Sequence, residues 1–172
     1  MTLLDAPKFD EAADRRRRVI LIGSGGLLLA LFVAWWLVAG MPVDLPWNWN
    51  NHLHGRAAVN SFLTAVEKND LPRAYGIWTH DKDWQQHAAQ HAPYPFTRFQ
   101  VDWSPNSSEN EYGAIHSHRI AAARMRGNIL LVGIFVNDTN KNAINLDYDP
   151  KEKTLNFSPE DVRFLEGPGG IH

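Results

Sequence analysis

Hydrophobic and polar positions divide the chain into segments with different periods. Residues 19–39 form an unbroken apolar run of 21 residues, VILIGSGGLLLALFVAWWLVA, without a charge or a proline. At the helical rise this run spans about 31 Å, close to the roughly 30 Å hydrocarbon core of a bilayer. It is apolar on all faces, unlike the half-buried surface helix of a soluble protein. We therefore predict a single transmembrane helix over residues 19–40.

The residues beside the apolar run predict its orientation. Four arginines precede it, namely Arg15, Arg16, Arg17 and Arg18, and the next basic residue is Arg56. Basic residues beside a span favour the cytoplasmic side, so the tail of residues 1–18 is expected inside. The C-terminal part is then periplasmic or otherwise extracytoplasmic, on a single-pass inner-membrane protein. Indole rings suit the lipid headgroup region. The candidates for this membrane interface are Trp35, Trp36, Trp47 and Trp49.

A cleaved signal peptide is the alternative interpretation of the same run. Its apolar region is normally about 7–15 residues and ends in a small-x-small cleavage site. The run here is longer, and Val38-Ala39-Gly40 is a poor cleavage site. A membrane anchor is therefore favoured.

A helical period follows the linker of residues 41–51, in which Pro42 and Pro46 block helix continuation. From His52 an apolar stripe at helical spacing predicts a helix that ends at Lys68-Asn69. Asp70 is a good N-cap for a second helix that runs to about Trp78. The two form a helical hairpin, and a third short helix is expected over residues 82–91.

After residue 95 the period becomes two, which predicts strands. We expect them at 96–103, 112–126, 129–136, 144–148, 155–157 and 162–164. The run at 129–136 is apolar at nearly every position, as in a central strand covered on both faces. Turns are expected at 138–142 and 149–153, and a tail at 167–172. Helices followed by antiparallel strands predict an α+β domain over residues 52–166.

Composition removes several classes of function. From residue 41 onward the chain has 12 Lys and Arg residues and 15 Asp and Glu residues, so the net charge of this part is −3. This argues against nucleic acid as a partner, because nucleic-acid binding needs a basic face. The chain has no cysteine, which rules out disulfides, thiolate nucleophiles and cysteine-ligated metals. An exported domain without disulfides fits a bacterial envelope, and we expect no cofactor.

The segment GRAAVNSFLTAVEKNDLPRAYGIW, residues 55–78, together with the predicted sheet, resembles the nuclear transport factor two-like superfamily. It resembles in particular small membrane-anchored members of unknown function. The resemblance implies a cone-shaped α+β fold, in which a bent antiparallel sheet wraps the helices. The superfamily includes enzymes of the ketosteroid isomerase type and many non-catalytic binding modules, so the fold does not choose between them. Inner-membrane components of type IV secretion systems resemble the same layout.

Some residues are candidates for chemistry. His116 and His118 share a strand face and are candidate acid and base groups, but half-exposed positions on a sheet edge or outer face are favoured for them. The pocket-catalysis candidates are Asp102, His116, His118 and Tyr148. His87 and His91 stand four residues apart, a spacing that holds a metal on a helix face. The glutamate of a zinc protease motif is missing after His87, so exposed, solvated histidines are favoured over a metal site.

Aromatic residues are dense between residues 78 and 103. A pocket for a small apolar ligand and an ordinary core both fit this pattern, and the core is favoured. The candidate lining residues are Trp78, Trp84, Phe99 and Trp103.

We therefore expect a non-catalytic, membrane-anchored accessory or assembly subunit of a larger envelope complex. Its partners would be membrane lipid and other subunits of that complex. The alternatives are a type IV secretion-like inner-membrane scaffold and a membrane-tethered pocket enzyme or small-ligand binder.

Overall fold

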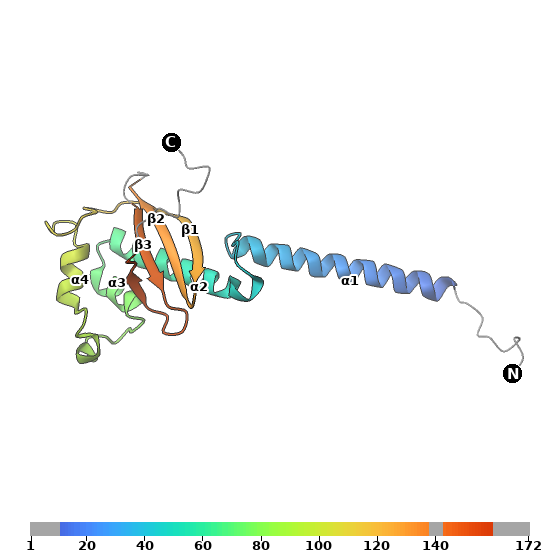
Figure 1. Ribbon diagram of the computed structural model, residues 1–172, viewed down its shortest axis with the longest axis horizontal. Helices are drawn as coiled ribbons and strands as arrows, with labels where there is room; N and C mark the ends of the chain where they lie inside the picture. Colours follow the sequence, from blue (N-terminus) through green and yellow to red (C-terminus); the bar gives the residue numbers. More distant parts are fainter. Residues whose placement is uncertain (1–10, 138–142, 160–172) are drawn as a thin grey trace, which may run out of the picture. The chain divides into compact units, whose positions relative to one another are not determined.

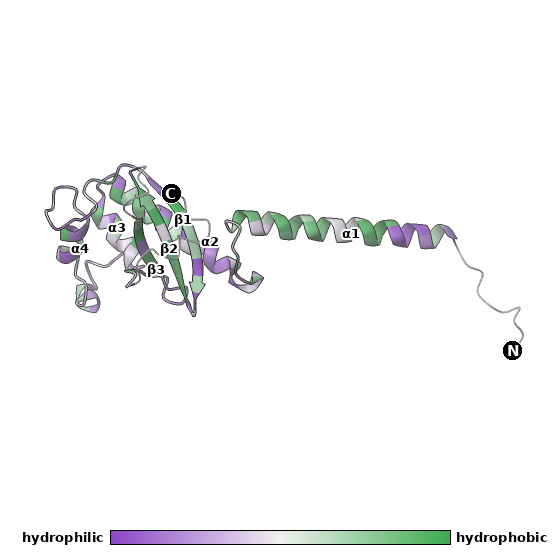
Figure 2. Cartoon of the chain, turned by 45° about the horizontal axis from the view of Figure 1, so that its top comes forward, coloured by the Kyte–Doolittle hydropathy of each residue, from purple (hydrophilic) through white to green (hydrophobic). Residues whose placement is uncertain are grey.

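The computed structural model describes residues 11–137 and 143–159, which belong to two compact units, residues 1–41 and 42–172. The first unit contains α1 (Glu11–Val38), a helix of 28 residues with no buried residue (Figure 1). Most of α1 is hydrophobic, with a hydrophilic segment at its start (Figure 2). By length and composition this helix is suited to cross a membrane. Because α1 begins at Glu11, it includes the four arginines that precede the apolar run.

The second unit, called the head below, begins with the predicted helical hairpin. The short 3-10 helix η2 (Pro46–Asn48) leads into α2 (Trp49–Glu67), and α3 (Leu71–Trp78) follows. Asn69 turns the chain with a φ of 53°, and Asp70 Oδ1 accepts a hydrogen bond from Arg73 N at 3.2 Å. This side-chain cap is the one that the sequence predicts. Helix α2 starts three residues before the predicted position, so the linker is shorter than expected.

The segment after α3 differs from the prediction. Residues 96–103, predicted as a strand, form the helix α4 (Phe96–Trp103). The alternation of apolar residues there also fits a helix, because Phe96, Phe99 and Trp103 share one helical face at i, i+3 and i+7. The helix predicted at 82–91 is also wrong, since turns lead into a short 3-10 helix, η3 (Ala88–His91).

Among the described residues, four antiparallel strands form a curved sheet in the order β1-β2-β3-β4. They are β1 (His118–Arg126), β2 (Ile129–Val136), β3 (Ala143–Tyr148) and β4 (Leu155–Phe157). Gly127, at a φ of 59°, makes the tight turn between β1 and β2, where glycine avoids strain. Strand β1 starts six residues later than predicted, because the Asn110 side chain holds residues 104–113 in turns. The predictions for residues 138–142, 162–164 and 167–172 concern segments outside the described residues.

One face of the sheet carries the core of the head. Apolar side chains alternate along β2 and β3, and α2 packs against this face. Gly55 allows the close approach, because a Cβ there would lie 2.8 Å from Tyr148 Cδ1 and would also meet the Leu130 side chain. The head is thus an α+β unit in which one helical hairpin covers one face of an antiparallel sheet.

Candidate functional site

Aromatic rings fill the space between the helices and the sheet. The ring of Phe62 lies 4.8 Å from that of Trp103 and 5.3 Å from that of Trp78, centroid to centroid. Trp103 stacks on Phe157 at 5.6 Å with only 7° between the ring planes. Trp78, Phe99 and Trp103 are all buried. Three of the four candidate pocket-lining residues therefore pack inside the core, and only Trp84 lines the groove described below.

Two of the candidate catalytic residues are engaged in separate contacts. Asp102 accepts a hydrogen bond from the Tyr94 hydroxyl at 2.8 Å and pairs with Arg98 at 2.7 Å. Burial, together with this carboxylate, raises the pKa of Tyr94. His118 Nδ1 lies 2.6 Å from Glu67 Oε1, and its Nε2 lies 2.9 Å from Asn60 Oδ1. Asp102 thus braces α4, whereas His118 ties β1 to α2.

The other two candidates lie elsewhere. His116 is exposed, and its backbone N–H donates to Asn137 Oδ1 at 2.8 Å. Tyr148 is buried on the inner face of β3 against Gly55. Within the described parts of the chain, no hydrogen bond joins His116, His118, Asp102 or Tyr148 to one another. The arrangement does not assemble an acid–base pair.

The candidate metal residues meet a carboxylate instead of sharing a helix face. His87 Nδ1 and His91 Nε2 lie 2.8 Å and 3.0 Å from the same oxygen, Asp81 Oδ2. A carboxylate only accepts hydrogen bonds, so both ring nitrogens donate. Among residues 11–137 and 143–159 there is no group of three or more His, Cys, Asp or Glu side chains suited to hold a metal ion. These three residues form a hydrogen-bonded clamp that closes the loop after α3.

The clamp predicts that the stability of the head depends on pH in the acid range. The hydrogen bond from His91, with a smaller one from His87, lowers the pKa of Asp81 from 3.8 to about 2. Because the folded-state pKa is depressed, the stability due to ionised Asp81 is present above 3.8 and is lost as the pH falls toward 2. In Asp81→Asn we expect a thermal midpoint that depends less on pH across this window. Thermal unfolding of the full-length protein in detergent micelles at several pH values measures it.

Asp83→Asn is the matched control, because Asp83 is exposed and its backbone N–H, not its carboxylate, contacts Asp81. An acid response that is the same in Asp81→Asn and in the unmodified protein would contradict the assignment.

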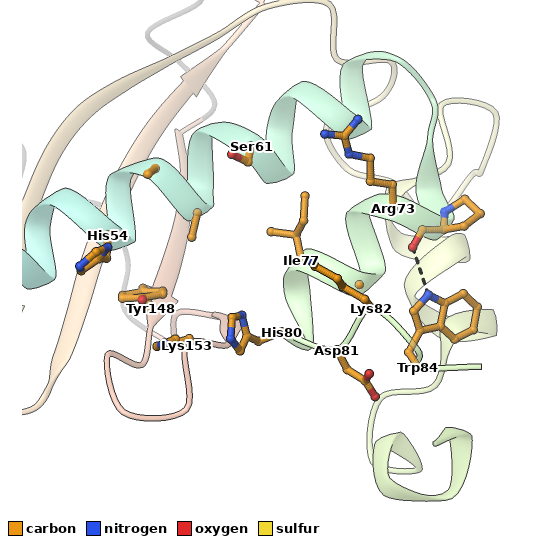
Figure 3. Close-up of a pocket in the computed structure, with 14 residues that line it drawn as sticks. His54, Ser61, Arg73, Ile77, His80, Asp81, Lys82, Trp84, Tyr148 and Lys153 are labelled. Atoms are coloured by element: carbon orange, nitrogen blue, oxygen red, sulfur yellow. Dashed lines mark hydrogen bonds between the residues drawn. The ribbon is translucent and has the colours of Figure 1, made fainter. Parts of the chain in front are cut away.

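An open groove lies on the surface of the head between α2, α3 and the turn that joins β3 to β4 (Figure 3). We call it the α2–α3 groove, and its volume is about 1120 Å³. Its lining residues are His54, Ala57, Ala58, Ser61, Pro72, Arg73, Gly76, Ile77, His80, Asp81, Lys82, Trp84, Tyr148 and Lys153. The floor is mostly apolar or small, and most of the charged groups are exposed.

The groove is cationic. Arg73, Lys82 and Lys153 are exposed, and within the described residues none of them forms an ion pair. Among the described lining residues Asp81 is the single carboxylate, and it is already bonded to His87 and His91. The groove therefore combines a low-polarity floor with positive charge that the described residues of the head leave unpaired.

The tryptophans expected at the membrane interface differ in exposure. Trp35 and Trp47 are 36% and 71% exposed, whereas Trp49 is only 4% exposed. The Trp49 indole N–H donates to the backbone oxygen of Asp44 at 2.9 Å. Trp49 is thus buried, and its place at the membrane interface stays a prediction.

The carboxylate of Asp44 makes contacts that were not predicted from the sequence. Asp44, in the predicted linker, accepts hydrogen bonds at Oδ2 from His52 Nε2 at 2.6 Å and from Met125 N at 3.0 Å. The sequence gives only a weak signal for these hydrogen bonds, because Met125 of β1 is distant from Asp44 in the sequence.

No protein-family model, curated protein or solved structure matches this chain.

Proposed function

We propose that this protein is a non-catalytic, membrane-anchored accessory or assembly subunit whose head binds another protein of a membrane complex. The α2–α3 groove carries the proposal, because its apolar floor and its cations, which form no ion pair with any described residue, are features of a binding surface. Helix α1, long and apolar enough to span a bilayer, supports the role of anchor.

The interior of the head supports binding over catalysis. An enzyme of the ketosteroid isomerase type needs a carboxylate base and an oxyanion donor that face one cavity. Here Phe62, Trp78 and Trp103 pack against one another where such a cavity would lie between the helices and the sheet. The carboxylate of Asp102, the candidate base, accepts a hydrogen bond from Tyr94 and forms an ion pair with Arg98.

The proposal includes a fold family and an orientation. A helical hairpin followed by a curved antiparallel sheet supports a cone-shaped, nuclear transport factor two-like head, to which a type IV secretion-like scaffold is the related alternative. Arg15, Arg16, Arg17 and Arg18 are exposed on the first half of α1, which supports a cytoplasmic N-terminus. The head then lies in the periplasm or another extracytoplasmic space.

Orientation is tested with single cysteines, since the chain has none. Ser108 lies on an exposed turn of the head and Thr2 lies in the N-terminal tail. In intact spheroplasts, a membrane-impermeant maleimide should label Ser108→Cys and spare Thr2→Cys until the cells are lysed. The reverse labelling pattern overturns the orientation.

The binding role is tested by purifying the tagged full-length protein from gently solubilised membranes at its native expression level. We expect a reproducible set of companion membrane proteins, identified by mass spectrometry. A tagged chain that carries α1 but lacks residues 42–172 is the control, and it should lose companions that the head binds. Purification of the protein with lipid alone overturns the proposal.

A further inference from the structure

We infer that the α2–α3 groove receives an acidic amphipathic helix of the partner protein, an inference that rests on the proposed function. Three independent features of the groove support this choice of occupant. They are the shape of its floor, the placement of its charges and the rigidity of its walls.

The floor permits the close approach of a helix. Helix α2 presents Ala57, Ala58 and Ser61, which are small side chains spaced at i, i+1 and i+4 on one side of the helix. Helix α3 adds Ile77, whereas the space beside Gly76 is filled by Asp81 and Trp84. Small residues let helix axes approach to about 8 Å, and apolar ridges of a third helix can enter such a groove.

The charges lie in both halves of the groove. Figure 3 shows Lys153 and His54 toward one end, and Arg73 and Lys82 in the other half. A fatty acid or another amphiphile with one anionic group would satisfy one end only. An elongated partner with several carboxylates along one side matches all three permanent cations. The openness of the groove also favours a helix, since pockets for small ligands bury most of the ligand surface.

The walls of the groove are held in place before binding. The Trp84 indole N–H donates to Pro72 O at 3.2 Å, and its ring lies 4.6 Å from that of Phe96 and 4.9 Å from that of Tyr75. Lys153 sits in a tight turn with a φ of 59°, closed by its N–H to Asp149 O at 2.6 Å. A preformed site loses little conformational entropy on binding.

The test uses fluorescence anisotropy with the full-length protein in phosphatidylcholine nanodiscs. The probe is a labelled helical peptide of about 18 residues, built from leucine, alanine and glutamate with its apolar residues on one face. A peptide with lysine in place of glutamate is the matched control, and empty nanodiscs give the background. We expect the glutamate peptide to bind and the lysine peptide to stay at background.

Two triple variants separate the groove from general charge. Arg73→Glu/Lys82→Glu/Lys153→Glu should weaken binding of the glutamate peptide about tenfold or more, because like charges then face each other. Lys68→Glu/Arg124→Glu/Lys151→Glu changes net charge equally at exposed positions outside the groove lining and should change affinity less than about twofold. Ala57→Trp, a change at an exposed position on α2, should abolish binding by filling the floor.

The inference is overturned if the two peptides bind equally, if neither binds, or if both triple variants weaken binding alike. It is also overturned if the groove cations bind phosphatidylglycerol vesicles and not the glutamate peptide, which would indicate a lipid headgroup as the ligand. If the glutamate peptide does not bind while companion proteins still co-purify through the head, the groove assignment is wrong and the proposed function stands.

Discussion

Replacing Trp103 by alanine is expected to lower the free energy of unfolding of the head by about 3–5 kcal/mol, the usual loss for a large buried aromatic residue. Trp103 is 1% exposed, and its ring contacts Phe62 at 4.8 Å and Phe157 at 5.6 Å. It therefore joins α2, α4 and β4 in one cluster. The thermal midpoint of the full-length protein in detergent micelles, followed by near-ultraviolet circular dichroism, should fall by roughly 10–20 °C.

Trp47→Ala is the matched control, because it removes the same side chain at a position that is 71% exposed. Its free energy of unfolding should change by no more than about 0.5 kcal/mol. Equal losses in the two variants would mean that the aromatic cluster does not hold the head together.

Asp44→Ala should destabilise the head by about 2–4 kcal/mol, since it leaves a donor of the buried His52 and one of the half-buried Met125 without an acceptor. His52 is 1% exposed, and its Nε2 lies 2.6 Å from Asp44 Oδ2. The same oxygen accepts the backbone N–H of Met125 in β1 at 3.0 Å. We expect faster amide hydrogen exchange at Met125 together with a lower thermal midpoint.

Asp83→Ala is the control here, because it deletes a carboxylate at an exposed position and should leave the midpoint nearly unchanged. Asp44→Asn keeps one oxygen acceptor and should fall between the other two variants. Unchanged exchange at Met125 in Asp44→Ala would contradict the role given to Asp44.

The parts of the fold that follow local rules could be predicted from the sequence. The hairpin of α2 and α3 has a helical period, a turn at Asn69 and a cap at Asp70, each set by neighbouring residues. The hairpin of β1 and β2 is similarly marked by Gly127-Asn128. Helix α4 could not be predicted in this way, because eight residues with alternating apolar positions fit both periods. Its state depends on packing against Phe62 and Tyr75, which lie elsewhere in the chain.

The candidate site was less accessible to sequence reasoning. Arg73, Lys82 and Lys153 come from three separate segments, and only the folded chain brings them to one groove. His87 and His91 were singled out for a spacing that presumes a helix, whereas their common partner Asp81 lies outside that spacing. In the same way, Asp44 lies in the segment predicted as a linker and has a partner 81 residues away.

The contact between Asp44 and Met125 determines how mechanical load would enter the head. Tension applied to the chain at Pro42 reaches Asp44 before α2, and its carboxylate is bonded to β1 as well as to His52. Part of the force is therefore transmitted to the edge strand β1, which is hydrogen-bonded to β2. That part of the force does not act on the first turn of α2. A head fastened in this way resists unravelling from its N-terminal end.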